Sequence, residues 1–210
     1  MSWKIKRRLR EQLEREHGYF SFPTGTRRSF ALVYPNSYFV GMSNLGLHII
    51  YDLLNRRGDT ACERVFLPDR TELPRYERTQ TPMMSVETQT PLADFAVIGF
   101  VISFEMDYFH VVKMLALSHV RLRASERTAR DPLVIAGGPC ATFNPEPLAE
   151  IVDAFVIGEG EAVMPALMDA YHESIRQGED RAALLRRLAR VPGVYVPALY
   201  CVDYDAAGRI

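Results

Sequence analysis

The segment 132–161 contains two short apolar runs, and each run stops at glycine. The first is LVIAGG (133–138) and the second is AFVIGEG (154–160). Short continuous apolar runs bounded by glycine are typical of strands that are buried on both faces of a parallel sheet. Glycine at the end of such a strand lets backbone and ligand approach closely, because no Cβ intervenes.

A short helix is predicted between these two runs. Asn144 is a good helix cap, and Pro145 suits the first helical position, where its missing N–H has no cost. A strand, a helix and a second strand make a unit with parallel strands. The carboxyl ends of such strands share one edge of the sheet, which is the ligand-binding edge of open α/β sheets.

The rest of the chain repeats this alternation of strands and helices. We therefore predict an α/β fold of flavodoxin-like (Rossmann-like) type, with a doubly wound, five-stranded parallel sheet in the order 2-1-3-4-5. The loop before the first long helix is expected to end at Ser43 as its cap. The remaining strands are expected at 30–34, 60–67 and 95–102, and the helices at 44–56, 106–119, 162–176 and 180–190.

Three regions follow from this pattern. Residues 1–27 form an amphipathic helix (2–17) and a linker, 28–190 form the α/β domain, and 191–210 form a β extension. In the extension, strands are expected at 193–197 and 199–204, with a hairpin partner beginning at Arg209. The chain stops there, which predicts a longer polypeptide with a further domain. Residues 68–91 hold four prolines and form a long excursion, a feature that is often functional.

Composition excludes several classes of protein. The 210 residues are 48% hydrophobic, with a formal net charge of -1, so a folded domain without a general affinity for nucleic acid is expected. Cys62, Cys140 and Cys201 are too scattered for a disulfide framework or a closed zinc site. No signal sequence or membrane span is visible. A soluble, cytoplasmic protein that does not bind membranes is therefore expected.

Three stretches of the sequence resemble a known family. They are ALVYPNSYFVGMSNLG (31–46), ADFAVIGFVISFE (93–105) and LVIAGGPCATFNPEPLAEIVDAFVIGEGE (133–161). Together they are similar to the N-terminal, cobalamin-binding-like domain of largely uncharacterised radical S-adenosylmethionine (SAM) proteins. The resemblance implies a downstream radical SAM domain with a C-x-x-x-C-x-x-C motif. The three cysteines of this chain cannot form that motif, so the 4Fe-4S cluster and SAM are expected only in the downstream domain.

The resemblance also implies a cobalamin site, with one difference. Characterised cobalamin domains carry D-x-H-x-x-G after the first strand, and the histidine binds cobalt. The loop 35–41 has no histidine here, and His48 lies at an apolar position of the next helix. Cobalamin is therefore expected without a histidine ligand on cobalt. Ser103 and the pair Gly137-Gly138 match the residues that line the pocket for the nucleotide tail.

The candidate site consists of residues at the carboxyl ends of the predicted strands. Several have a structural alternative: the 158–161 turn can simply start a helix, and Glu105 and Asp107 can cap a helix rather than act as acid and base. The aromatic residues Tyr38, Phe39, Phe104, Tyr108 and Phe109 either support a flat macrocycle or cover the sheet. The cofactor-binding candidates are Asn36, Ser37, Tyr38, Ser103, Glu105, Gly137, Gly138, Pro139, Gly158, Glu159 and Gly160.

Two functions from different classes remain open. One is an accessory cobalamin-binding domain of a radical SAM enzyme, not catalytic by itself. The other is a scaffold that binds no corrinoid and recognises a substrate, such as a macromolecule, or a partner through residues 68–91. A phospho-receiver and an FMN site are disfavoured, because Ser103 and Gly158 replace the required Asp and Lys, and Pro35 to Tyr38 form a poor phosphate loop.

Overall fold

The computed structural model describes residues 3–23, 25–201, 203 and 205–208, and its centre is a six-stranded sheet in the order β2-β1-β3-β4-β5-β6. The first five strands are parallel and follow the predicted order, and β6 adds an antiparallel edge strand. The sheet was predicted to have five strands, and it has six. The strands are β1 (Arg28–Tyr34), β2 (Thr60–Phe66), β3 (Val97–Val101), β4 (Leu133–Gly137), β5 (Ala154–Val156) and β6 (Val194–Tyr195).

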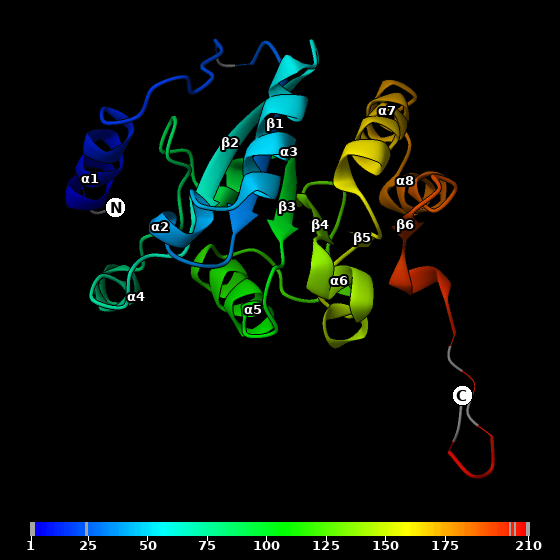
Figure 1. Cartoon of the computed structure of the whole chain (residues 1–210). Coiled ribbons are helices and arrows are strands. Elements are labelled where there is room, and N and C mark those ends of the chain that lie inside the picture. The colour runs from blue at the N-terminus through cyan, green and yellow to red at the C-terminus, as the bar shows by residue number, and fades with distance from the viewer. Residues whose placement is uncertain (1–2, 24, 202, 204, 209–210) are drawn as a thin grey trace.

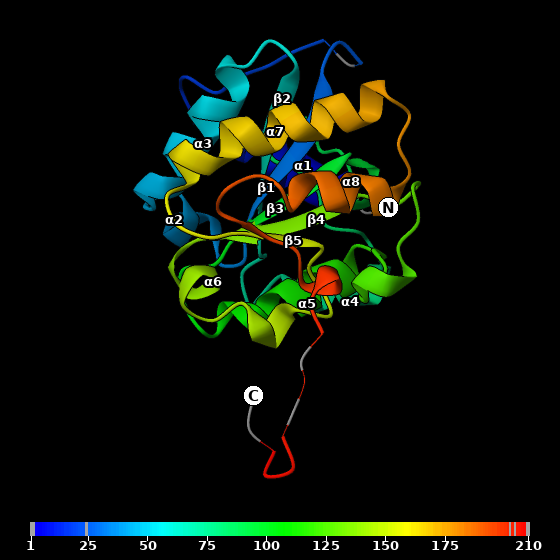
Figure 2. The ribbon, with the colours of Figure 1, turned by 90° about the vertical axis from the view of Figure 1, so that its right-hand side faces the viewer.

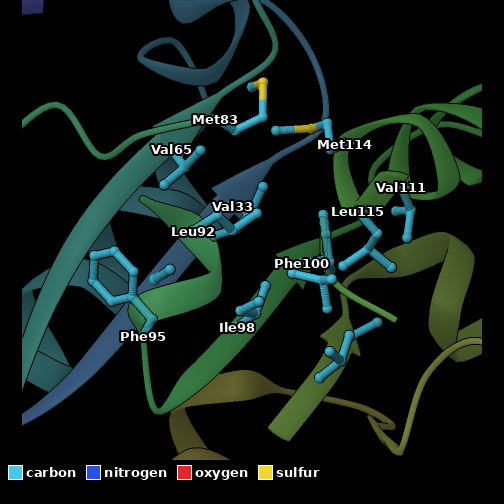
Figure 3. Close-up of a cluster of buried hydrophobic side chains, with 14 of the residues drawn as sticks. Val33, Val65, Met83, Leu92, Phe95, Ile98, Phe100, Val111, Met114 and Leu115 are labelled. Carbon is cyan, nitrogen blue, oxygen red and sulfur yellow. The ribbon is translucent and has the colours of Figure 1, made fainter. Parts of the chain in front are cut away.

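Helices cover both faces of the sheet, which gives three layers (Figure 2). One face carries α3 (Leu45–Arg56), α7 (Gly160–Arg176) and α8 (Arg181–Leu188). The other face carries α4 (Leu73–Thr79), α5 (Asp107–Leu117) and α6 (Pro139–Phe143), and Figure 3 shows its closely packed core. Short 3-10 turns lie at Leu92–Asp94, Ala124–Glu126, Glu146–Leu148 and Pro197–Leu199.

Two predicted helix starts were wrong. The cap of α3 is Asn44 rather than Ser43, because Asn44 has an extended backbone and its Oδ1 accepts the Leu47 N–H at 2.8 Å. The helix α6 begins straight after Gly138, whose φ of 104° permits the sharp turn that other residues avoid. Asn144 therefore ends α6, and only a 3-10 turn follows it. A short helix, α2 (Tyr38–Gly41), also occupies the predicted loop after β1.

The excursion 68–91 covers the outer edge of β2. Val86 N–H donates to Arg64 O at 2.8 Å, and Arg64 N–H donates to the Glu87 carboxylate at 2.8 Å. The Arg64 side chain is 3% exposed and pairs with Glu87 at 2.7 Å and Glu16 at 2.8 Å. Covering an edge strand in this way prevents it from pairing with other chains.

The N-terminal helix α1 (Trp3–Leu13) packs on this excursion, beside β2 (Figure 1). Ile5 is buried in the core, and Arg8 pairs with Asp69 at 3.2 Å. The N-terminal segment is thus integrated into the domain through the 68–91 region.

The end of the chain differs from the prediction. The residues before Pro197 supply β6, but a 3-10 turn follows, and the described part of 199–204 contains no strand. Pro197 removes a backbone donor, which disfavours continued pairing. The predicted hairpin partner at Arg209 lies outside the described residues.

Candidate ligand-binding cleft

A cleft of about 590 Å³ lies between α3 and α7, above the carboxyl ends of β3, β4 and β5. Its volume is within the range, roughly 300–1,000 Å³, of small-molecule sites. The floor is apolar and the rim is polar. The floor comes from Phe30 and Leu32 of β1, Ile135 of β4, Val156 of β5, Ile50 of α3 and Met164 of α7.

Glycines create much of this space. On Gly46, in the first turn of α3, an added Cβ would have only Asn44 Oδ1 within 4 Å, at 3.3 Å, so this helix leaves the cleft open. On Gly99 of β3 an added Cβ would lie 2.6 Å from Cζ of Phe30, so the glycine accommodates that ring across the strand. Gly138 is constrained differently, because a Cβ there would lie 2.7 Å from the Ile102 carbonyl oxygen.

The rim provides hydrogen-bonding groups and negative charge. Asn44 Nδ2 donates to Ser103 Oγ at 3.4 Å, which leaves the Ser103 hydroxyl proton free to donate elsewhere. Gly158 N–H donates to Thr142 Oγ1 at 3.2 Å and ties the loops after β4 and β5 together. Glu159 and Glu161 stand at the start of α7. None of the described residues that line the cleft is lysine or arginine.

The structure brings most of the predicted site residues together. The following candidates line the cleft: Ser103, Gly137, Gly138, Pro139, Gly158, Glu159 and Gly160. Strand β4 carries the glycine pair between the loops after β3 and β5, so this grouping follows from the sheet order.

Four candidates do not line the cleft. The Tyr38 hydroxyl donates to Glu16 at 2.9 Å, and burial together with this carboxylate raises the pKa of Tyr38 to about 12. Asn36 Oδ1 accepts the Ser37 N–H at 2.8 Å, so both residues belong to a turn. Glu105 is exposed. These residues belong to the segments that follow β1 and β3, and none of them lines the cleft.

Asp107, the first residue of α5, holds the loop that precedes this helix instead of capping the helix. Its side chain is fully buried, and its Oδ2 accepts the N–H groups of Ser103 at 3.1 Å and Phe104 at 3.0 Å. Burial raises the pKa of Asp107, and these two hydrogen bonds oppose that rise. Through Ser103, Asp107 fixes one wall of the cleft.

No local pattern in the sequence singles out His110. His110 Nδ1 lies 2.8 Å from the carbonyl oxygen of Pro35, in the loop after β1. The contact joins residues far apart in the chain and depends on the pairing of β1 with β3, which no local pattern reveals. His48, which the sequence did single out, bonds through Nε2 to Met42 O at 2.9 Å and does not line the cleft.

Large apolar side chains are exposed at the same carboxyl edge of the sheet. Of the five aromatic residues considered above, Phe39, Phe104 and Phe109 are exposed, whereas Tyr38 and Tyr108 are half-buried with bonded hydroxyls. We call the full group the apolar edge, with exposures between 52% and 89%: Phe39, Leu45, Phe104, Met106, Phe109 and Phe143. The three phenylalanines therefore do not serve to cover the sheet.

Comparison with known proteins places the chain in a family. Residues 46–197 match the family described as radical SAM proteins, N-terminal, and the chain belongs to this family. It is also 28% identical over 134 residues to an uncharacterized protein of Methanocaldococcus jannaschii. That match covers 64% of this chain and 24% of the relative, so the chain spans about a quarter of the relative's length. No solved structure matches significantly.

Among the described residues, no helix is both long and apolar enough to cross a membrane.

Proposed function

We propose that this chain is an accessory cobalamin-binding domain of a radical SAM enzyme, and that the cleft between α3 and α7 receives the nucleotide tail of the cofactor. The cleft itself carries the proposal: it has an apolar floor and lies beside Ser103, Gly137 and Gly138. These are the positions that the family resemblance assigns to the tail. The chemistry and the substrate of the whole enzyme are assigned to the domain that follows in such proteins.

The residues of the cleft suit a nucleotide with an aromatic base. Phe30, Ile135 and Val156 offer apolar surface for the flat base, and the Ser103 hydroxyl offers a donor for a ring nitrogen. The carboxylates of Glu159 and Glu161 can accept hydrogen bonds from ribose hydroxyls.

The same residues disfavour a nucleotide with several phosphates. The helix dipole of α7 would attract an anion at the cleft, but the two glutamates offset it, and no basic residue lines the described cleft. A ligand with a single phosphodiester that can remain in solvent fits this electrostatic environment better.

Bound cobalamin supplies a cobalt centre that carries an alkyl group and changes oxidation state. The chain itself binds and orients the cofactor. The apolar edge offers surface beneath or beside the macrocycle, and the loop 35–41 contains no histidine for cobalt. The iron–sulfur cluster and SAM belong to the downstream domain, which we propose as the principal partner.

The apolar edge also supports the second function, a scaffold without a corrinoid. Several exposed large apolar side chains at one edge are typical of interaction sites, and in this alternative the edge binds the downstream domain, or a macromolecular substrate, directly. The excursion 68–91 is a weaker candidate, because Met83, Met84 and Val86 are buried in packing on the sheet.

A substitution at Gly46 tests the cofactor proposal. Gly46→Leu places a side chain in the cleft from a helical position at which the new Cβ would meet Asn44 Oδ1 at 3.3 Å, so that the Asn44 side chain must shift slightly. Replacing glycine by leucine in a helix also improves helix propensity, by roughly 0.5–1 kcal/mol, which opposes the cost of this contact. Gly138→Leu is a poorer probe, because its Cβ would clash with the backbone of Ile102.

Binding is measured by the absorbance change of hydroxocobalamin and of cobinamide, which lacks the nucleotide tail. We expect Gly46→Leu to weaken cobalamin binding at least about tenfold and to leave cobinamide binding unchanged. Gly58→Leu is the control, because Gly58 has open space around it and lies beyond the other end of α3, away from the cleft. If the unmodified chain binds neither corrinoid, the scaffold function is favoured.

A further inference from the structure

Phe143 differs from the other five side chains of the apolar edge, because it alone among them also lines the cleft between α3 and α7. It is 89% exposed, so its ring stands at the entrance of the cleft rather than inside it. Phe143 ends α6, and Figure 1 and Figure 2 both show this helix on one side of β4 and β5, with α3 and α7 on the other side. The ring therefore reaches the cleft from the layer opposite to the helices that flank it.

The backbone of α6 is anchored, so the exposed ring does not belong to a loosely held loop. Ala141, in the middle of the helix, is fully buried. The Tyr108 hydroxyl lies 3.0 Å from the carbonyl oxygen of Cys140 and 2.8 Å from that of Asn144, the residue after Phe143. Because the backbone is held in this way, it is mainly the side-chain torsions of Phe143 that set the position of its ring.

The floor of the cleft offers a second apolar surface for the same ligand. Phe30, Ile135 and Val156 line this floor and are buried. A flat group that lay on the floor would turn its other face toward the entrance, where the Phe143 ring stands. Aromatic groups form favourable stacked or edge-to-face contacts, and such a contact would also remove from water the apolar surface that Phe143 now exposes.

We propose that Phe143 covers the flat base of the bound nucleotide, so that the base is held between this ring and the floor of the cleft. The inference rests on the proposed function and adds a residue that determines specificity, because the contact favours ligands with a flat aromatic group. The other five side chains of the apolar edge line no part of the cleft, which leaves them for the macrocycle.

Comparison of cobalamin with cobinamide, which lacks the nucleotide tail, tests this contact. Phe143→Ala should weaken cobalamin binding about tenfold, a usual loss when the aromatic partner of a stacked base is truncated, and should leave cobinamide binding unchanged. Phe143→Trp retains an aromatic ring and should bind cobalamin as well as the unmodified chain does. Because Phe143 is so exposed, neither variant should unfold more readily than the unmodified chain, which urea unfolding checks.

Tyr200→Ala is the control for the loss of an exposed aromatic side chain. Tyr200 is 63% exposed and does not line the cleft. This variant should bind cobalamin and cobinamide as the unmodified chain does.

Tryptophan fluorescence gives a second measurement that is independent of the macrocycle. Trp3 is the one tryptophan of the chain and is exposed, so Trp3→Phe combined with Phe143→Trp places a single indole at the entrance of the cleft. The probe is α-ribazole, the free nucleoside of the cobalamin tail. We expect it to shift the indole emission to shorter wavelength and to protect the indole from quenching by acrylamide.

Three results would overturn the role of Phe143. An equal loss of cobalamin and cobinamide binding in Phe143→Ala would mean that the ring contacts the macrocycle instead of the base. Unchanged cobalamin binding in this variant would mean that the ring contacts neither, and the proposed function would then stand without Phe143 if Gly46→Leu still weakens cobalamin binding. If the unmodified chain does not bind cobalamin, the proposed function and the role of Phe143 both fail.

Discussion

The two faces of the sheet are built from alternate residues of the same strands, yet one face is closed and the other is open. On the α5 face, Ile98, Phe100 and Leu115 meet in a dense core (Figure 3). On the opposite face, α3 and α7 leave a cleft of about 590 Å³ at their N-terminal ends. The difference arises from small residues: Gly46, Gly137 and Gly160 line the open side.

This contrast indicates that the cleft is formed by omitting side chains rather than by adding loops. Side chains in protein cores pack at high density, so an unfilled volume of this size under two helices costs contacts. A ligand can recover those contacts. On the α5 face the corresponding space is filled by side chains such as Ile98, Phe100 and Leu115.

The largest expected effect compares one core residue from each face. Leu115→Ala, on α5, leaves a sealed cavity and should lower the free energy of unfolding by about 2–5 kcal/mol. Met164→Ala, on α7, should cost less, roughly 1–2 kcal/mol. The lost volume opens into the cleft, so no sealed cavity forms, and the cost is mainly the lost hydrophobic free energy of the removed atoms. Urea unfolding of both variants measures the difference. Equal losses would mean that the cleft is not open to solvent beside Met164.

A smaller effect is expected from adding a side chain at Gly99, in strand β3 beneath the cleft. An added methyl group in Gly99→Ala would lie 2.6 Å from Phe30 Cζ, so the ring must move. Overpacking of a closed core costs about 1–3 kcal/mol, and we expect a loss at the low end because Phe30 borders the cleft and can shift into it. Cobalamin binding should weaken at the same time. A stable variant with unchanged binding would exclude Phe30 from the binding surface.

Much of the fold and of the site could be predicted from the sequence, because both follow from short local patterns. The apolar runs that end at glycine fixed the strands, and the order of parallel strands then brought Ser103, Gly138 and Gly158 to one cleft. The role of Tyr38 could not be predicted, because its partner Glu16 comes from the N-terminal segment. The same holds for His110, whose environment depends on contacts between distant loops.

The smallest expected effect concerns the end of α7 opposite the cleft. His172 is partly buried there, and its Nε2 lies 3.2 Å from Thr60 Oγ1 and 3.4 Å from Asp59 Oδ1. Burial lowers the pKa of His172 below its usual 6.5; Asp59 opposes this effect, and Arg57, Arg28 and Arg176 add to it. The unfolded chain therefore binds more protons than the folded chain between the lowered pKa and about 6.5.

Stability should consequently fall as the pH decreases below about 6.5, and it should be independent of this group at higher pH. Because one group takes up at most one proton, the free energy of unfolding cannot change by more than about 1.4 kcal/mol per pH unit. Urea unfolding between pH 5 and 7.5 should show the slope in the unmodified chain and a flatter profile in His172→Gln. The exposed His17, substituted in the same way, controls for a general change in charge. If His172→Gln leaves the profile unchanged, burial does not lower the pKa of His172, and the C-terminal part of α7 is as open to water as the part that borders the cleft.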